Sequence, residues 1–146
     1  MTIMNPIKEA FGEKLHGSEF PPCPFCHPDP DRIMLLDDDD VFAIYDKFPV
    51  NPGHVLVIPK RHYENYFDLT REEQAACIAA LNLVKEIIQN KYSPDGFNIG
   101  INIGRDAGQT VGHVHIHLIP RFRGDVSKPE GGVRGVIPKK RVYKLK

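Results

Sequence analysis

The sequence predicts a single α+β domain in which an antiparallel sheet packs against one long helix. Short apolar segments rich in β-branched residues alternate with turns rich in proline, glycine and aspartate, as is typical of strands. One longer segment, residues 70–91, repeats its apolar residues at helical spacing instead. We divide the 146 residues into an N-terminal extension (1–22), a central domain (23–122) and a basic, irregular C-terminal tail packed on that domain (123–146).

The first half of the chain predicts strands and turns. The extension is expected to contain a short helix around residues 7–15 and to be closed by Pro21 and Pro22. The acidic run 37–40 is expected to be a solvated turn, and the prolines of segment 46–52 prevent continuous sheet pairing there. Strands are predicted between these breaks, at residues 33–36, 41–45 and 53–58.

The predicted helix has a clear start and end. Thr70 and Glu73 have the spacing of a capping box, and Ser93 to Gly96 end the periodic segment. Cys77 lies among alanine and isoleucine, where a small buried side chain is expected. A strand over 97–103 and a turn at 104–108 should follow, so the sheet is an antiparallel meander that leads into a strand of histidines.

Charge is spread unevenly along the chain. The formal net charge is zero, yet residues 121–146 hold nine Lys or Arg against Asp125 and Glu130. Such a tail could bind nucleic acid, reach towards a phosphate-bearing ligand, or simply be a solvated terminus, which we favour. No apolar run is long enough for a membrane span, the first residues do not form a signal peptide, and three cysteines do not suggest a disulfide framework. We therefore expect a cytoplasmic protein without membrane or nucleic-acid partners.

The most informative segment is His113-Val-His-Ile-His117. In a strand all three imidazoles share one face, with neighbours about 6.6 Å apart at Cα and the outer two about 13 Å apart. Two neighbours could share a zinc ion, but three in one strand could not, so at least one histidine needs another task. A neutral imidazole can attack phosphorus, and the middle one, His115, is the natural nucleophile. The alternative is three solvated histidines on an ordinary strand.

The turn before the histidines suits a phosphate group. Residues 108–111, Gly-Gln-Thr-Val, offer backbone N–H groups, an amide and a hydroxyl to anionic oxygens. The whole stretch from Gly108 to Arg121 resembles the histidine triad (HIT) family of nucleotide hydrolases and transferases, most closely the fragile-histidine-triad branch, which cleaves diadenosine polyphosphates. The resemblance extends over most of residues 23–122, through Asp46, segment 53–60 and Asn102, and implies a HIT-like fold.

The resemblance implies a role for each matching residue. His115 would be the nucleophile, His117 would contact the phosphate and leaving group, and His54 would be a fourth histidine beside the nucleophile. Asp46 would bind the ribose, although it could also be a turn-forming aspartate, and Asn102 would lie near the scissile phosphates. The phosphate-cradling turn would consist of Gly108, Gln109, Thr110 and Val111, with Thr110 stabilising charge in the reaction.

Cys23 and Cys26 have the spacing of half a structural zinc site. The resemblance implies that His62 and His113 complete a Cys2His2 site, which would leave His115 and His117 for phosphate. The alternative is two reduced, partly buried thiols. A closed structural zinc would not activate water, and magnesium would enter only with the substrate.

By resemblance, the chain is expected to be a nucleotidyl hydrolase that cleaves dinucleoside polyphosphates at the α-phosphate through a covalent nucleotidyl-histidine, releasing a nucleoside monophosphate. Asp46 and Asn102 also suit a nucleoside phosphoramidate hydrolase. A non-catalytic AMP-binding regulatory module is a third hypothesis. The family forms dimers through the long helix and adjacent strand, so a homodimer is expected, and Arg134 of the tail is a candidate for completing the partner's active site.

Overall fold

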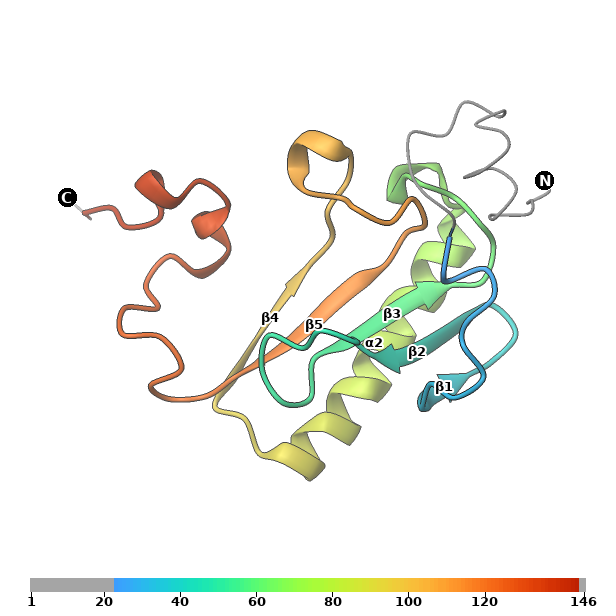
Figure 1. Cartoon of the computed structure of the whole chain (residues 1–146), viewed down its shortest axis with the longest axis horizontal. Coiled ribbons are helices and arrows are strands. Elements are labelled where there is room, and N and C mark those ends of the chain that lie inside the picture. The colour runs from blue at the N-terminus through green and yellow to red at the C-terminus, as the bar shows by residue number, and fades with distance from the viewer. Residues whose placement is uncertain (1–22, 145–146) are drawn as a thin grey trace.

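The protein is described by a computed structural model covering residues 23–144; the extension and its expected helix lie outside the described residues. One antiparallel sheet contains β1 (Met34–Asp37), β2 (Val41–Tyr45), β3 (Val55–Pro59), β4 (Gly96–Gly100) and β5 (Ile116–Arg121). The helix α2 (Arg71–Tyr92) covers one face and runs behind the sheet in Figure 1. The predicted α+β class is thus confirmed. Among the described residues, no helix is long and apolar enough to cross a membrane.

The strands lie in the order β1-β2-β3-β5-β4. The expected meander holds for the first three strands, but β5 then inserts between β3 and β4. The residues of β5 explain this central position, because Ile116 and Leu118 are buried on the helix side, whereas β4 carries two glycines and lies at the edge. The insertion brings His117 opposite Leu56 of β3.

The helix begins as its capping box predicts. The Glu73 N–H donates to the Thr70 hydroxyl oxygen at 3.0 Å, and the Thr70 N–H donates to the Glu73 carboxylate at 2.8 Å. Ser93 ends the helix in the left-handed region. The buried face of α2, which includes the expected Cys77, packs on the apolar residues of β2, β3 and β5 and forms the main core.

The opposite sheet face has its own smaller core, and the functional side chains lie beside it. Phe42, Ile44, Leu56 and Ile58 point away from the helix and are covered by the loop that carries Cys23 and Phe25. This loop leaves part of the face open. The sequence therefore separates a helix-covered face from a face that is available for chemistry.

Two predicted strand boundaries are wrong. β4 ends at Gly100, so residues 101–103 have left the sheet, and β5 begins only at Ile116, so His113 to His115 precede the strand. The paired strand β3 ends at Pro59, whose nitrogen carries no hydrogen to continue the ladder. The Val114 N–H donates to the carbonyl of Tyr63 instead.

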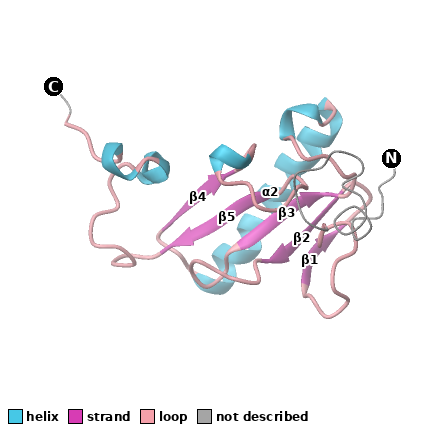
Figure 2. Cartoon of the chain, turned by 45° about the horizontal axis from the view of Figure 1, so that its top comes forward, coloured by secondary structure: helices cyan, strands magenta, loops and turns pink. Residues whose placement is uncertain are grey.

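The tail extends past the β4 edge of the sheet in both views (Figures 1 and 2). It contains the short 3-10 helices η4 (Gly132–Val136) and η5 (Pro138–Lys140), and η4 lies beside β4. The guanidinium of Arg141 donates to the carbonyls of Lys128 and Glu130 and closes the tail on itself. The tail thus has a defined shape of its own.

Candidate active site and metal centre

Two cysteines and two histidines from distant parts of the chain converge on one point. The cluster consists of Cys23, Cys26, His62 and His113, whose ligand atoms all lie within 4.8 Å of one another. Cys23 Sγ is 3.3 Å from His113 Nδ1, Cys26 Sγ is 3.1 Å from His62 Nδ1, and the two Nδ1 atoms are 3.2 Å apart. A tetrahedral zinc site with ordinary bond lengths has ligand-to-ligand distances of roughly 3.3–3.8 Å. The observed distances fit a metal ion held by these four residues.

The surroundings of the cluster also suit a metal. His113 Nε2 lies 2.7 Å from the carbonyl of Pro59, which places the ring proton on Nε2 and leaves Nδ1 free to coordinate. The pKa of Cys23 is lowered to about 2, chiefly by the hydrogen bond with Cys26 and further by His113 and His62. The thiolate is the form that binds metal. The four predicted ligands are therefore assembled, and Cys23 and His113 have the protonation that a metal requires.

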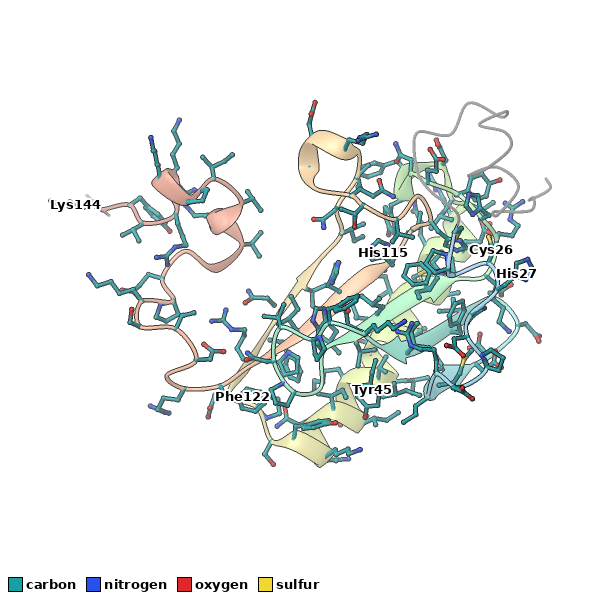
Figure 3. The ribbon with its side chains drawn as sticks, in the orientation of Figure 1. Cys26, His27, Tyr45, His115, Phe122 and Lys144 are labelled. Atoms are coloured by element: carbon teal, nitrogen blue, oxygen red, sulfur yellow. The ribbon has the colours of Figure 1, made fainter. Side chains whose placement is uncertain are left out.

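A cavity of about 730 Å³ lies on the sheet face opposite α2. Figure 3 shows His115 and Cys26 at the same end of the sheet. Seven residues that the sequence singles out line this cavity: Asp46, His54, Asn102, Thr110, Val111, His115 and His117. Gly108 and Gln109 are not among its lining residues.

His115 has the geometry of a neutral nucleophile. Its Nδ1 lies 2.8 Å from the carbonyl of His113, so Nδ1 carries the proton and Nε2 keeps a lone pair. Burial lowers the pKa of His115, which keeps the ring neutral near pH 7. The edge of Phe25, between the two cysteines, packs on the ring with centroids 5.2 Å apart. His115 is thus held by one hydrogen bond and by ring contacts with Phe25 and His117.

His54 and His117 form a second pair. The Val50 N–H donates to His54 Nδ1 at 3.0 Å, which places the proton of neutral His54 on Nε2. That nitrogen is 3.0 Å from His117 Nδ1 and 3.4 Å from an Asp46 oxygen. Because His117 accepts on Nδ1, its own proton lies on Nε2.

The charge of this pair follows from its burial. Burial, with the neighbouring His115 and His54, lowers the pKa of His117 to about 4. Burial also lowers the pKa of His54, although the nearby Asp46 carboxylate opposes the shift. His117 is therefore a neutral side chain with an Nε2–H that can donate to a bound anion.

Asp46, His54 and His117 also lie close enough together to resemble a metal site. A metal on His54 Nε2 would require both nitrogens of the ring to lose their protons, because Nδ1 already accepts the Val50 N–H. This arrangement favours a hydrogen-bonded relay over a metal ion.

The Gln109 side chain lies inside the protein and does not line the cavity. It donates to the carbonyls of Glu64 and Val111, and accepts from the Gly104 N–H. Gly108 is in the left-handed conformation that lets the chain turn there. These two residues shape the turn that presents Thr110 and Val111 to the cavity.

Sequence reasoning missed several residues of the site, three of which have a clear role. Phe25 packs on His115, Phe48 is exposed on the rim of the cavity, and Val50 orients His54 through its backbone. The position of Phe25 inside the Cys-x-x-Cys segment was the one available signal. Arg134 lies elsewhere, with its guanidinium bound to the carbonyls of Lys140 and Arg141 and stacked on Tyr143.

Comparisons with known proteins identify relatives of this chain. An uncharacterized HIT-like protein of Methanocaldococcus jannaschii is 42% identical over 92 residues, which is 63% of this chain and 70% of that protein. The asymmetrical bis(5'-nucleosyl)-tetraphosphatase of Schizosaccharomyces pombe is 46% identical over 80 residues, covering 55% of this chain and 44% of the enzyme. A crystal structure of a zinc-bound histidine triad family protein from Mycobacterium smegmatis has 35% identity and a TM-score of 0.66, covering 73% of this chain and 79% of that one.

The family model of the HIT domain matches residues 28–124 and includes all the predicted nucleotide-contacting residues. Cys23 and Cys26 precede this match, so half of the metal cluster lies outside it. The resemblance seen in the sequence is confirmed: the chain belongs to the HIT domain family.

Proposed function

We propose that the protein is a nucleotidyl hydrolase that cleaves dinucleoside polyphosphates at the α-phosphorus and releases a nucleoside monophosphate. The observation that carries the proposal is His115, a buried neutral imidazole in the cavity whose Nδ1–H is bound by the His113 carbonyl. The name of the Schizosaccharomyces pombe relative supports the substrate class. The reaction would proceed in two displacements.

In the first displacement, His115 Nε2 forms a bond to the α-phosphorus while the bond from phosphorus to the bridging oxygen breaks. The ring becomes positively charged, and the His113 carbonyl stabilises this charge through Nδ1–H. His117 Nε2–H would donate a hydrogen bond to the departing oxygen. Thr110 and neighbouring backbone N–H groups would stabilise the equatorial oxygens.

In the second displacement, a water molecule attacks the same phosphorus and the bond to His115 breaks. The proton lost by water passes to the solvent or to the released phosphate, and His115 returns to its neutral form. Each cycle thus consumes one water and yields one nucleoside monophosphate.

Asp46 and Asn102 would bind the nucleotide. One Asp46 oxygen accepts the Phe48 N–H at 2.8 Å, which fixes the carboxylate at the cavity wall. Both oxygens of a carboxylate can accept from ribose hydroxyls. Exposed Phe48 would provide a ring for the base. Magnesium carried on the substrate would offset phosphate charge.

Cys23, Cys26, His62 and His113 would hold a structural zinc ion. Four protein ligands leave no position for a reacting water, so zinc would supply rigidity at the base of the cavity. Thiolate ligands also suit a reducing compartment, in keeping with a cytoplasmic location.

We further propose a homodimer without nucleic-acid partners. α2 exposes Ile78, Leu83 and Ile87, which gives an apolar surface for a second copy. Several basic groups of the tail are already bound within the chain, as Arg141 is to the carbonyls of Lys128 and Glu130. Size measurement in solution should give twice the chain mass, and a monomer at micromolar concentration would refute the dimer.

The deciding experiment is to trap the covalent intermediate. Brief reaction with radiolabelled diadenosine tetraphosphate, followed by acid-free quenching, should yield a nucleotidyl adduct that His115→Ala lacks. Competing rates on an adenosine phosphoramidate would distinguish the two hydrolases, since much faster phosphoramidate turnover would overturn our choice. AMP binding with no adduct and no turnover would indicate a regulatory module instead.

A further inference from the structure

A second cavity opens from the active site on its tail side. It has a volume of about 430 Å³, within the range of small-molecule sites, and lies between β4, β5 and η4. Val50, His54, Asn102 and His117 line both cavities. The two spaces therefore meet at the histidine that we place beside the leaving group.

The two cavities differ in chemistry. The first carries the nucleophile and Asp46, whereas the second is walled mainly by apolar side chains from the sheet and from the tail, among them Ile119, Val133 and Val136. Such walls favour an apolar or aromatic group over a phosphate.

The position of the second cavity matches the geometry of displacement at phosphorus. The attacking nitrogen and the departing oxygen lie roughly in line across the phosphorus. His115 lines only the first cavity, while His117 lines both. A group that leaves opposite His115 and passes His117 thus moves towards the second cavity.

We propose that this second cavity is a leaving-group subsite that binds the base of the second nucleoside of the substrate. The proposal rests on the proposed hydrolase function and adds to it a preference for leaving groups that end in an aromatic base. The tail contributes Gly132, Val133, Gly135 and Val136, which lie beyond the matched HIT region, so this specificity depends in part on the tail.

The tail is built to hold this wall in place. Gly131 has a φ of +89°, and a Cβ there would lie 2.1 Å from the Arg141 carbonyl oxygen, so the turn depends on glycine. Gly132 approaches the sheet closely, since its Cβ would lie 3.4 Å from the Asn98 amide nitrogen. The Arg134 N–H then donates to the Gly131 carbonyl and begins η4.

The test compares two substrates with the same phosphate chain, diadenosine tetraphosphate and adenosine 5'-tetraphosphate, which lacks the second nucleoside. The double variant Val133→Asn/Val136→Asn makes the wall polar without adding charge, and both side chains are exposed enough to spare the fold. We expect kcat/KM for diadenosine tetraphosphate to fall about tenfold, with adenosine tetraphosphate changed by less than about twofold. Ile137→Asn, at an exposed neighbour that does not line the cavity, should leave both values unchanged.

Equal losses on both substrates, or no loss on either, would overturn the subsite while leaving the hydrolase intact. If the unaltered protein cleaves neither substrate, the proposed function fails and the subsite fails with it. A selective loss confined to the dinucleotide supports both.

Discussion

Two histidine clusters lie within one small domain. They differ in the backbone group that contacts one ring nitrogen of a histidine in each cluster. In the Cys2His2 cluster, His113 donates through Nε2 to the Pro59 carbonyl, so Nδ1 offers a lone pair to a metal. In the Asp46-His54-His117 cluster, His54 accepts the Val50 N–H at Nδ1, so Nε2 offers a proton. Similar spacing thus suits a metal ion in one place and a hydrogen-bonded relay in the other, and a backbone group makes the difference.

The largest expected effect tests whether turnover depends on His115, which lies beside the Asp46-His54-His117 cluster. His115→Ala removes the proposed nucleophile and should lower turnover of diadenosine tetraphosphate by about 10⁴-fold or more. Bound zinc should stay at one per chain, because His115 is not a ligand of the cluster. Steady-state kinetics and metal analysis of the same sample measure both. Turnover within tenfold of the unaltered protein would exclude His115 as nucleophile.

The proposed metal site is tested through zinc content and the free energy of unfolding. Cys26→Ser removes one of four ligands and should lose zinc and destabilise the fold by about 3 kcal/mol or more. Cys77→Ala is the matched control, since this thiol lies on the buried face of α2 and burial raises its pKa to about 11. The control should retain zinc, although it loses some packing. Urea denaturation with zinc analysis provides the measurement, and full zinc retention by Cys26→Ser would contradict the site.

A smaller effect tests the direction of the relay. His54→Phe keeps a ring but removes the Nε2–H that we assign to His117 Nδ1. We expect kcat to fall about 10- to 100-fold with little change in KM, while zinc content stays constant. If the cluster were a metal site instead, added zinc would bind to the unaltered protein at two per chain. Titration with zinc therefore distinguishes the relay from a second metal site.

The smallest effect concerns pH. His117 has an ordinary pKa of 6.5 that folding lowers to about 4, so between these values the unfolded chain binds the extra proton. The free energy of unfolding should therefore rise with pH across this window, and about 2 kcal/mol of it should be lost as pH falls from 6.5 to 4. This value is below the full shift because the side chain is partly exposed. His117→Gln should flatten the slope in urea denaturation at several pH values; an unchanged slope would contradict the assignment.

The sequence predicted local structure well because its signals were local. The capping box at Thr70, the strand at 41–45 and the helix end near Ser93 all depend on neighbouring residues. The place of β5 between β3 and β4 depends instead on long-range pairing, so it was not visible from the sequence. The late start of β5 follows from Pro59, a residue more than 50 positions earlier.

The distinction between local signals and long-range contacts also holds within the site. Residue types and the family resemblance led to seven of the residues that line the cavity and to the four members of the metal cluster. They could not predict the protonation of each ring, since Pro59 and Val50 act through a carbonyl and an N–H that every sequence has. Gln109 illustrates this limit of sequence reasoning, because its polar side chain stabilises a turn by hydrogen bonding and does not line the cavity.

His113 takes part in three attachments at once. Its Nδ1 lies against the cysteines, its Nε2 against the end of β3, and its carbonyl against the His115 ring. Because these three contacts hold His113, the residue cannot move without shifting all three of its partners. The N-terminal loop and the central sheet therefore hold the proposed nucleophile in place, and a small displacement of either would change the orientation of the His115 ring in the cavity.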